Sequence, residues 1–207
     1  MQFPAKIVFA SGNRGKLREV RSLFAAHDIE IVAQSDLGVV EVAETGSTFR
    51  ENSLIKSRHA AAATGLPALA DDSGLAVDAL GGEPGVLSAR YGGPAANDEQ
   101  NIDKLLRALE GVPAGRRTAA FHCVASFVDP ALDPAGYPPL IGEGVWNGRI
   151  LEARQGTGGF GYDPVFFDPV AGKSAARLDA GGKNAASHRG QALRALLATL
   201  EQRYAVG

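Results

Sequence analysis

The chain has 207 residues, of which 45% are hydrophobic and 21% charged, so neither wholesale disorder nor a highly charged tail protein is expected. Its 21 Lys and Arg against 23 Asp and Glu give a formal net charge of −2, which argues against a broad nucleic-acid-binding surface. A single cysteine excludes an intramolecular disulfide, and no apolar run approaches the length of about 18 residues that a membrane span needs. We therefore expect one cytoplasmic domain over residues 1–207, with no membrane and no nucleic-acid partner.

Strands and helices alternate at the start of the chain. Residues 6–10 (KIVFA) form a short apolar run that predicts a buried strand, and from Lys16 onward apolar residues recur at helical spacing. A second strand is expected at residues 30–33. A second helix is expected at about residues 48–63, where a Thr and a Glu three positions apart form a possible capping box.

The middle of the chain is interpreted as two strands with an acidic turn between them. Residues 66–70 and 75–80 are apolar, and the intervening residues 71–74 (DDSG) are turn formers. A long glycine-rich loop is expected over residues 81–93, followed by a third helix that begins near Asn97.

The last part of the chain is rich in expected strands and loops. Residues 117–128 and 140–146 predict a hairpin with a wide loop, residues 156–163 a second glycine-rich loop, and residues 187–203 a C-terminal helix. Helices interleaved with strands, followed by a β-rich segment, predict an α/β fold. We expect a central mixed β-sheet flanked by helices, and two lobes that enclose a substrate cleft.

The loop after the first strand has the features of a phosphate site. Small residues in SGNRGK, residues 11–16, let backbone N–H groups approach a ligand, and the start of the following helix favours an anion. Lys16 would supply the charge that faces a phosphate. The residues leave open a second interpretation, an ordinary strand-to-helix turn with a solvated lysine.

Two adjacent acids form the second candidate site. Asp71 and Asp72 carry carboxylates, which are oxygen ligands that Mg²⁺ accepts, and Glu41, Glu44 and Glu51 lie upstream. One of these carboxylates could also activate water. The alternative is that the two acids, with Ser and Gly behind them, simply make a turn.

The second glycine-rich loop, GTGGFGYD, formally satisfies the dinucleotide fingerprint GxGxxG. We reject that match because the fingerprint must open a helix, whereas Pro164 and Pro169 interrupt any helix here. The loop can instead lie close to a flat ligand, with Phe160 or Tyr162 stacked on a base. Packing of these two aromatic rings in the core is the alternative.

The start of the last helix carries basic residues. His188 and Arg189 fall in its first turn, where cations oppose the helix dipole. Basic groups at such a place favour an anion or a base carbonyl in front of them, and a solvent-exposed Arg is the alternative.

Five segments, taken in order, extend over nearly the full chain: SGNRGK, ETGSTFRENS, ADDSGLAVDALGGEPGVLSARYGG, GTGGFGYDPVF and SHRGQAL. Together they closely resemble the noncanonical purine nucleoside triphosphate pyrophosphatases, the inosine triphosphatase family. The resemblance implies a cytoplasmic homodimer that hydrolyses inosine, xanthosine and deoxyinosine triphosphates (ITP, XTP and dITP) to the monophosphate and pyrophosphate, using Mg²⁺.

The resemblance also implies a role for each matching position. Asp72 and Lys16 would be catalytic, and Asp72 would hold the metal together with Glu44. Relatives often carry two acids just before the Thr-Gly of ETGSTFRENS, but here Ala43 precedes Glu44, so Glu41 remains the less favoured alternative to Glu44. The positions implied in substrate binding are Ser11, Gly12, Asn13, Arg14, Gly15, Lys16, Ser73, Phe160, Gly161, Tyr162, Asp163, Lys183, His188 and Arg189.

Two other functions stay open at this point. One is a pyrophosphatase for modified pyrimidine triphosphates, which needs the same phosphate chemistry with a different base pocket. The other is a module that binds a purine nucleotide without cleaving it. The adjacent acids argue against the module, because carboxylates repel phosphates unless a metal intervenes.

Overall fold

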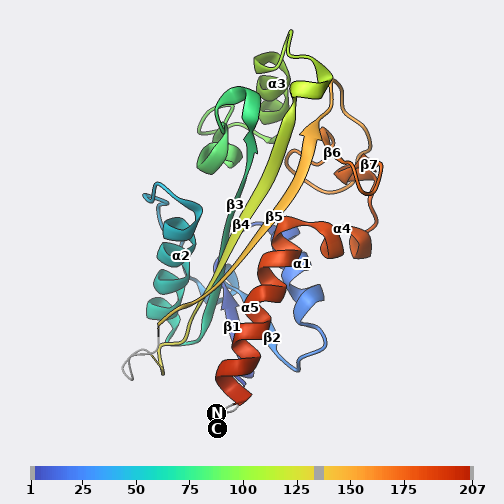
Figure 1. Cartoon of the computed structure of the whole chain (residues 1–207). Helices are drawn as coiled ribbons and strands as arrows, with labels where there is room; N and C mark the ends of the chain where they lie inside the picture. The colour runs from blue at the N-terminus through green and yellow to red at the C-terminus, as the bar shows by residue number, and fades with distance from the viewer. Residues whose placement is uncertain (1–2, 133–137, 206–207) are drawn as a thin grey trace. The chain divides into compact units, whose positions relative to one another are not determined.

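A computed structural model describes residues 3–132 and 138–205, and its strands form a sheet in the order β2-β1-β3-β4-β5-β6-β7 (Figure 1). β1 pairs in parallel with β2 and β3, whereas β5 with β6 and β6 with β7 are antiparallel. The strands are β1 Lys6–Phe9, β2 Glu30–Ala33, β3 Ala68–Val77, β4 Thr118–Val128, β5 Leu140–Ile150, β6 Phe166–Asp168 and β7 Lys173–Ser174. The helices are α1 Arg14–Phe24, α2 Phe49–Thr64, α3 Asp98–Ala108, α4 Ala180–Ala186 and α5 His188–Ala205. The predicted α/β fold with a mixed, helix-flanked sheet is confirmed.

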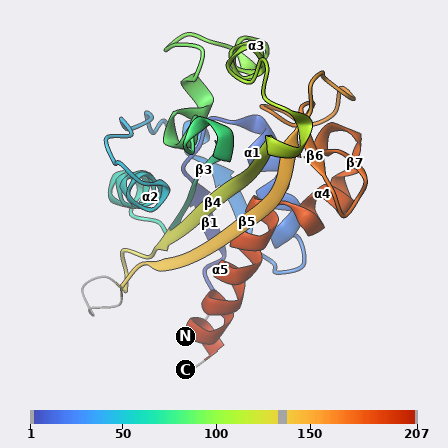
Figure 2. The ribbon, with the colours of Figure 1, turned by 45° about the horizontal axis from the view of Figure 1, so that its top comes forward.

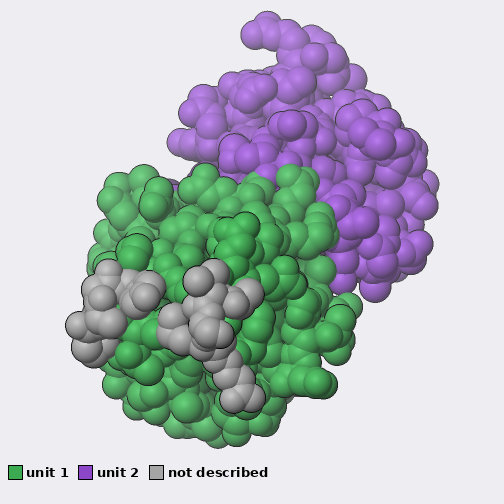
Figure 3. Space-filling view, turned by 60° about the horizontal axis from the view of Figure 1, so that its bottom comes forward, with its two compact units in different colours: residues 1–72, 123–144, 189–207 green, residues 73–122, 145–188 purple. Residues whose placement is uncertain are grey.

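The chain divides into two compact units, which Figure 3 colours separately. Unit 1 comprises residues 1–72, 123–144 and 189–207, and unit 2 comprises residues 73–122 and 145–188. Neither unit is one continuous segment, because β3, β4 and β5 each contribute residues to both. The interpretation as a single domain over residues 1–207 stays a prediction.

In unit 1, successive side chains of β1 pack into two different apolar cores. Successive side chains of a strand point to opposite faces of its sheet. Ile7 and Phe9 of β1 therefore join a core made with α1 and α5, whereas Val8 joins a second core with the alanines of α2. Figure 2 shows α2 and α5 on opposite sides of these strands. Ile7, Val8 and Phe9 are all apolar and buried because helices cover both faces of β1.

Unit 2 has its own apolar core. Ile102, Leu105 and Leu109, which follow one another at helical spacing along and just after α3, pack with side chains from β3, β4 and β5. The helix begins where predicted, because the side chain of Asn97 accepts the backbone N–H of Gln100 and completes a capping box.

The structure corrects the predicted acidic turn. β3 runs without a break from Ala68 to Val77, so residues 71–74 lie inside a strand. The turn-forming tendency of Asp and Gly is overridden because the carboxylates find charged partners on both faces of this strand.

Other differences concern length and short elements. β5 continues to Ile150, and α1 begins at Arg14 rather than at Lys16. The glycine-rich stretch at residues 81–93 contains a short 3₁₀ helix, Gly85–Arg90, and α4, β6 and β7 were not predicted. Part of the wide loop expected between β4 and β5, residues 133–137, lies outside the described residues. Within the described part of the chain, no helix combines the length and the apolar character that a membrane span needs.

Candidate functional site

The loop between β1 and α1 is held by its own side chains. Asn13 is the N-cap of α1, and its Oδ1 accepts the backbone N–H groups of Gly15 at 2.8 Å and Lys16 at 3.1 Å. Its own N–H donates to Ser11 Oγ at 3.2 Å. The predicted phosphate loop is thus a capped helix start, with the exposed side chain of Arg14 in the first turn.

Alternation along β3 sends the two adjacent acids to opposite faces of the sheet. Leu69 packs in the core made with α1 and α5, and Asp71, two positions on, faces the same way. Asp72 faces α2 instead. The two carboxylates therefore have separate partners and separate electrostatic environments.

Asp71 is 0% exposed and lies among cations. Its Oδ2 is 3.0 Å from Lys16 Nζ and 3.1 Å from Arg189 Nε, and the Cys123 thiol donates to the same oxygen at 3.8 Å. Burial alone would raise the pKa of Asp71, but Lys16 and Arg189 outweigh it and hold that pKa well below its usual range. Arg189 also pairs with Glu19 at 2.6 Å, so the solvent-exposed alternative for this arginine is wrong.

Asp72 shares one cation with Glu44. Lys56 Nζ on α2 lies 3.0 Å from Asp72 Oδ1 and 2.6 Å from Glu44 Oε1, so the two carboxylates converge on a single point. Asn52, one helical turn before Lys56, donates to Asp72 Oδ2 at 3.2 Å. Burial opposes the charge on Lys56, yet Asp72 and the neighbouring acids outweigh it and raise the pKa of Lys56. Burial, assisted by Glu44, keeps the pKa of Asp72 raised in spite of the ion pair.

The donor set at this point fits Mg²⁺. Mg²⁺ is usually held by one or two carboxylates, with substrate phosphates and waters completing the octahedron. Asp72 and Glu44 supply two such carboxylates around a position that attracts a cation, since Lys56 reaches it. Glu41 instead accepts the backbone N–H of Gly12 at 2.9 Å, which favours Glu44 of the two upstream acids. The described residues contain no cluster of three or more His, Cys, Asp or Glu that could hold a metal by protein ligands alone.

In unit 2, the predicted nucleoside loop is fixed by two carboxylates. Asp163 Oδ2 lies 2.6 Å from Lys183 Nζ and accepts the backbone N–H of Phe160 at 2.9 Å. The Lys183 ammonium also lies 4.4 Å from the centre of the Phe160 ring, a cation–π contact. Asp98, at the start of α3, accepts the N–H of Gly161 at 2.6 Å.

Of the other predicted site residues in unit 2, Tyr162 and His188 are buried and Ser73 is half-buried. The Tyr162 hydroxyl donates to the Ser88 carbonyl at 2.8 Å, and its ring belongs to the core of unit 2, so its role in substrate binding stays a prediction. The His188 ring stacks on Phe121 at 4.6 Å with only 8° between the ring planes. Ser73, the first residue of unit 2, is half-buried in β3.

A sequence model of the Ham1 family matches residues 7–199, which is most of the chain. The chain belongs to the Ham1 family. It is 59% identical over 195 residues to a protein of Methylococcus capsulatus and 56% identical to one of Pectobacterium atrosepticum, both named dITP/XTP pyrophosphatase. These alignments cover 94% of this Ham1 chain and 96% and 98% of the two relatives.

Solved Ham1 structures have the same fold. The structure of a HAM1 protein from Coxiella burnetii superposes with a TM-score of 0.86 at 48% identity and covers 98% of this chain and 100% of that one. The Staphylococcus aureus Ham1 protein gives 0.83 at 41% identity, with coverage of 96% and 99%. The family resemblance inferred from the five segments is therefore confirmed.

Sequence reasoning missed three residues of this Ham1 chain that contact the predicted site. Asn52 and Lys56 hold Asp72 and Glu44, and Asp98 holds the Gly161 backbone. The signal for the first two was their spacing of four residues, which places them on one face of α2. For Asp98 no local pattern existed, since Gly161 lies 63 positions away.

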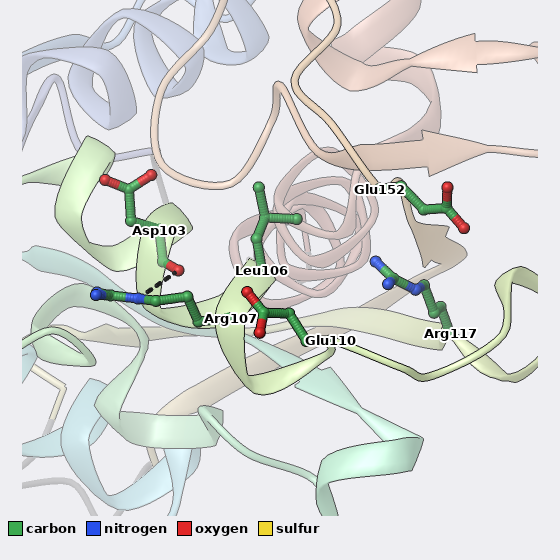
Figure 4. Close-up of a pocket in the computed structure, with 6 residues that line it drawn as sticks. All are labelled: Asp103, Leu106, Arg107, Glu110, Arg117 and Glu152. Carbon is green, nitrogen blue, oxygen red and sulfur yellow. Dashed lines mark hydrogen bonds between the residues drawn. The ribbon is translucent and has the colours of Figure 1, made fainter.

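A hollow of about 340 Å³ elsewhere in unit 2 contains none of the predicted site residues (Figure 4). Its lining is Asp103, Leu106, Arg107, Glu110, Arg117 and Glu152. The guanidinium of Arg117 donates to the carbonyls of Leu109 and Val112, just after α3. A cation there binds carbonyls that lack a partner within the helix and interacts favourably with the negative end of the helix dipole. Arg117 therefore stabilises the end of α3.

Proposed function

We propose that this chain hydrolyses noncanonical purine nucleoside triphosphates, namely dITP, ITP and XTP, to the monophosphate and pyrophosphate. The relatives with more than half of their residues identical are named for two of these substrates. The observation that carries the proposal in the structure is the convergence of Asp72 and Glu44 on one cation position.

In the proposed reaction, water attacks the α-phosphorus, the bond to the bridging oxygen breaks, and pyrophosphate leaves. Asp72 orients the water and accepts its proton, while Lys16 stabilises the charge on the phosphate oxygens. Asp72 and Glu44 would hold Mg²⁺, which supplies further positive charge to those oxygens when it is bound. Ser11 to Lys16 bind the triphosphate, with the loop geometry set by the Asn13 cap.

Unit 2 would recognise the base. Phe160 offers an aromatic face, and Lys183 and His188 offer donors to a carbonyl at C6 of the purine, with Ser73, Gly161, Tyr162 and Asp163 around them. Adenine carries an amino group at C6 and would leave such donors unpaired, which costs about 1–3 kcal/mol. A base contact by Arg189 stays a prediction, because its guanidinium here binds Asp71 and Glu19.

The family resemblance also motivates three further parts of the proposal: Mg²⁺ as the cofactor, assembly as a homodimer and a cytoplasmic location. The two-carboxylate donor set supports the first of these, since Mg²⁺ accepts such oxygen ligands.

The substrate test measures pyrophosphate release from dITP, XTP, dGTP and dATP, each with Mg²⁺ and with EDTA. We expect fast, Mg²⁺-dependent release from dITP and XTP and slow release from dATP. Release from modified pyrimidine triphosphates alone would indicate the pyrimidine alternative. Binding of dITP that persists in EDTA without release would indicate a nucleotide-binding module.

Asp72→Asn tests the catalytic assignment. We expect turnover of dITP to fall by at least about 100-fold, because the amide neither accepts a proton nor holds Mg²⁺ as a carboxylate does. Thermal unfolding of the variant checks that it remains folded, and Asp28→Asn, an exposed acid of unit 1, serves as the matched control. Wild-type turnover in folded Asp72→Asn would refute the role of Asp72.

A further inference from the structure

A carboxylate of this chain already occupies an N–H group of the proposed phosphate loop. Glu41 Oε1 accepts the backbone N–H of Gly12 at 2.9 Å, although the two residues are 29 positions apart. The approach depends on glycine, since a Cβ on residue 12 would lie only 2.5 Å from Glu41 Oε1.

This donor differs from its neighbours in the loop. The N–H groups of Asn13, Gly15 and Lys16 donate to Ser11 Oγ or Asn13 Oδ1, so their partners belong to the loop itself. The Gly12 N–H has an acceptor from a distant segment, and both Gly12 and Glu41 are exposed. Such a side chain can move away at little cost, because its carboxylate exchanges the N–H for water.

We propose that Glu41 lowers the affinity of the loop for phosphate groups, because its carboxylate occupies the place on the Gly12 N–H that a phosphate oxygen takes. The proposal deepens the proposed function and rests on it for the identity of the ligand. A carboxylate and a phosphate oxygen accept the same hydrogen bond and carry the same sign of charge, so they exclude each other there.

The displacement of Glu41 adds the same cost to the binding of substrate and of product. A nucleoside triphosphate has a base and sugar that supply further binding energy, whereas inorganic pyrophosphate has only its phosphate groups. Displacing Glu41 therefore costs pyrophosphate a larger share of its binding free energy. The consequence is that free pyrophosphate binds weakly, whereas a triphosphate keeps the affinity that its base and sugar supply.

The test uses calorimetry with inorganic pyrophosphate in EDTA, where no turnover takes place. Glu41→Gln removes the charge and keeps the size of the side chain, and we expect it to bind pyrophosphate about three- to tenfold more tightly than wild type. Glu201→Gln removes the same charge from an exposed site on α5, where the nearest ion-pair partner is His27, and should leave the affinity unchanged. In an amide NMR spectrum, pyrophosphate should shift the Gly12 resonance of Glu41→Gln at lower concentration than that of wild type.

Several outcomes would overturn the proposal. They are equal or weaker binding by Glu41→Gln, equal tightening in both variants, or no measurable pyrophosphate binding by any of the three proteins. An increased Mg²⁺ requirement of Glu41→Gln in dITP hydrolysis would show that Glu41 is a metal ligand instead. The failure of the proposed function looks different, because then no triphosphate is hydrolysed while Glu41→Gln still binds pyrophosphate more tightly.

Discussion

Asp71 shows how a buried charge becomes part of the structure. Its carboxylate has no contact with water, and Lys16 and Arg189 compensate its charge from α1 and α5. Removing one partner of a buried ion pair leaves the others uncompensated, which is why such changes are costly. Asp71 thus aims the Lys16 ammonium, which we propose to face the phosphates.

We expect Asp71→Asn to lower the free energy of unfolding by about 3 kcal/mol or more, measured by urea denaturation at about pH 7. The folded-state pKa of Asp71 is depressed, so its contribution is fully present above the unfolded-state pKa of about 3.9 and is lost as the pH falls below it. The difference between wild type and variant should therefore shrink towards about pH 3. The exposed Asp28→Asn is the control, and a difference that is small or constant with pH would contradict the role given to Asp71.

At the scale of elements, the sequence predicted what local patterns determine. β1, β2, α2 and α3 lie within a residue or two of their expected positions because apolar spacing and capping residues act within a few positions. β3 was misread because its acids are neutralised by distant residues: Arg189 lies 118 positions from Asp71. The placing of Asp71 and Asp72 on opposite faces, which decides the candidate site, follows only once β3 is known to be continuous.

In unit 1, β5 packs so closely against α5 at Gly142 that one added methyl group should destabilise the protein. A Cβ on Gly142 of β5 would collide with the Ala192 carbonyl oxygen of α5 and lie 2.7 Å from the Leu196 backbone nitrogen. Backbone atoms cannot swing aside as a side chain does, so we expect Gly142→Ala to destabilise the protein by about 1–3 kcal/mol and lower its melting temperature.

Gly115→Ala is the matched control for this variant. A Cβ on Gly115 meets no atom within 4 Å, so the melting temperature should be almost unchanged. If both variants melt at the wild-type temperature, the packing of β5 against α5 is looser than described here.

At the scale of the whole molecule, the chain passes between its two units inside β3, β4 and β5 and again after His188, the first residue of α5. Each of these three strands contributes residues to both units, so a strand that unfolds in one unit also disrupts the other. We therefore expect the units to unfold together rather than one after the other.

The chain carries one natural probe in each unit. Cys123, in unit 1, is 1% exposed, and burial raises the pKa of its thiol, so it should not react with a disulfide reagent in the folded protein. Trp146, in unit 2, is 5% exposed and donates to Asp168, so its fluorescence should change on unfolding. Thiol reactivity and fluorescence should change at the same urea concentration. Exposure of the thiol at a lower concentration than the fluorescence change would mean that unit 1 unfolds first.

The position of β3 against β1 pairs Val8 with Ala68 and Phe9 with Leu69, and this register decides which acid meets Lys56. A slip or deletion of a single residue in β3 would exchange the faces of every side chain beyond it. The two carboxylates would still be present in β3, but Asp72, the proposed general base, would then face α1 and α5 instead of α2. Evolution of this segment should accordingly tolerate exchanges of its apolar residues far better than changes in its length.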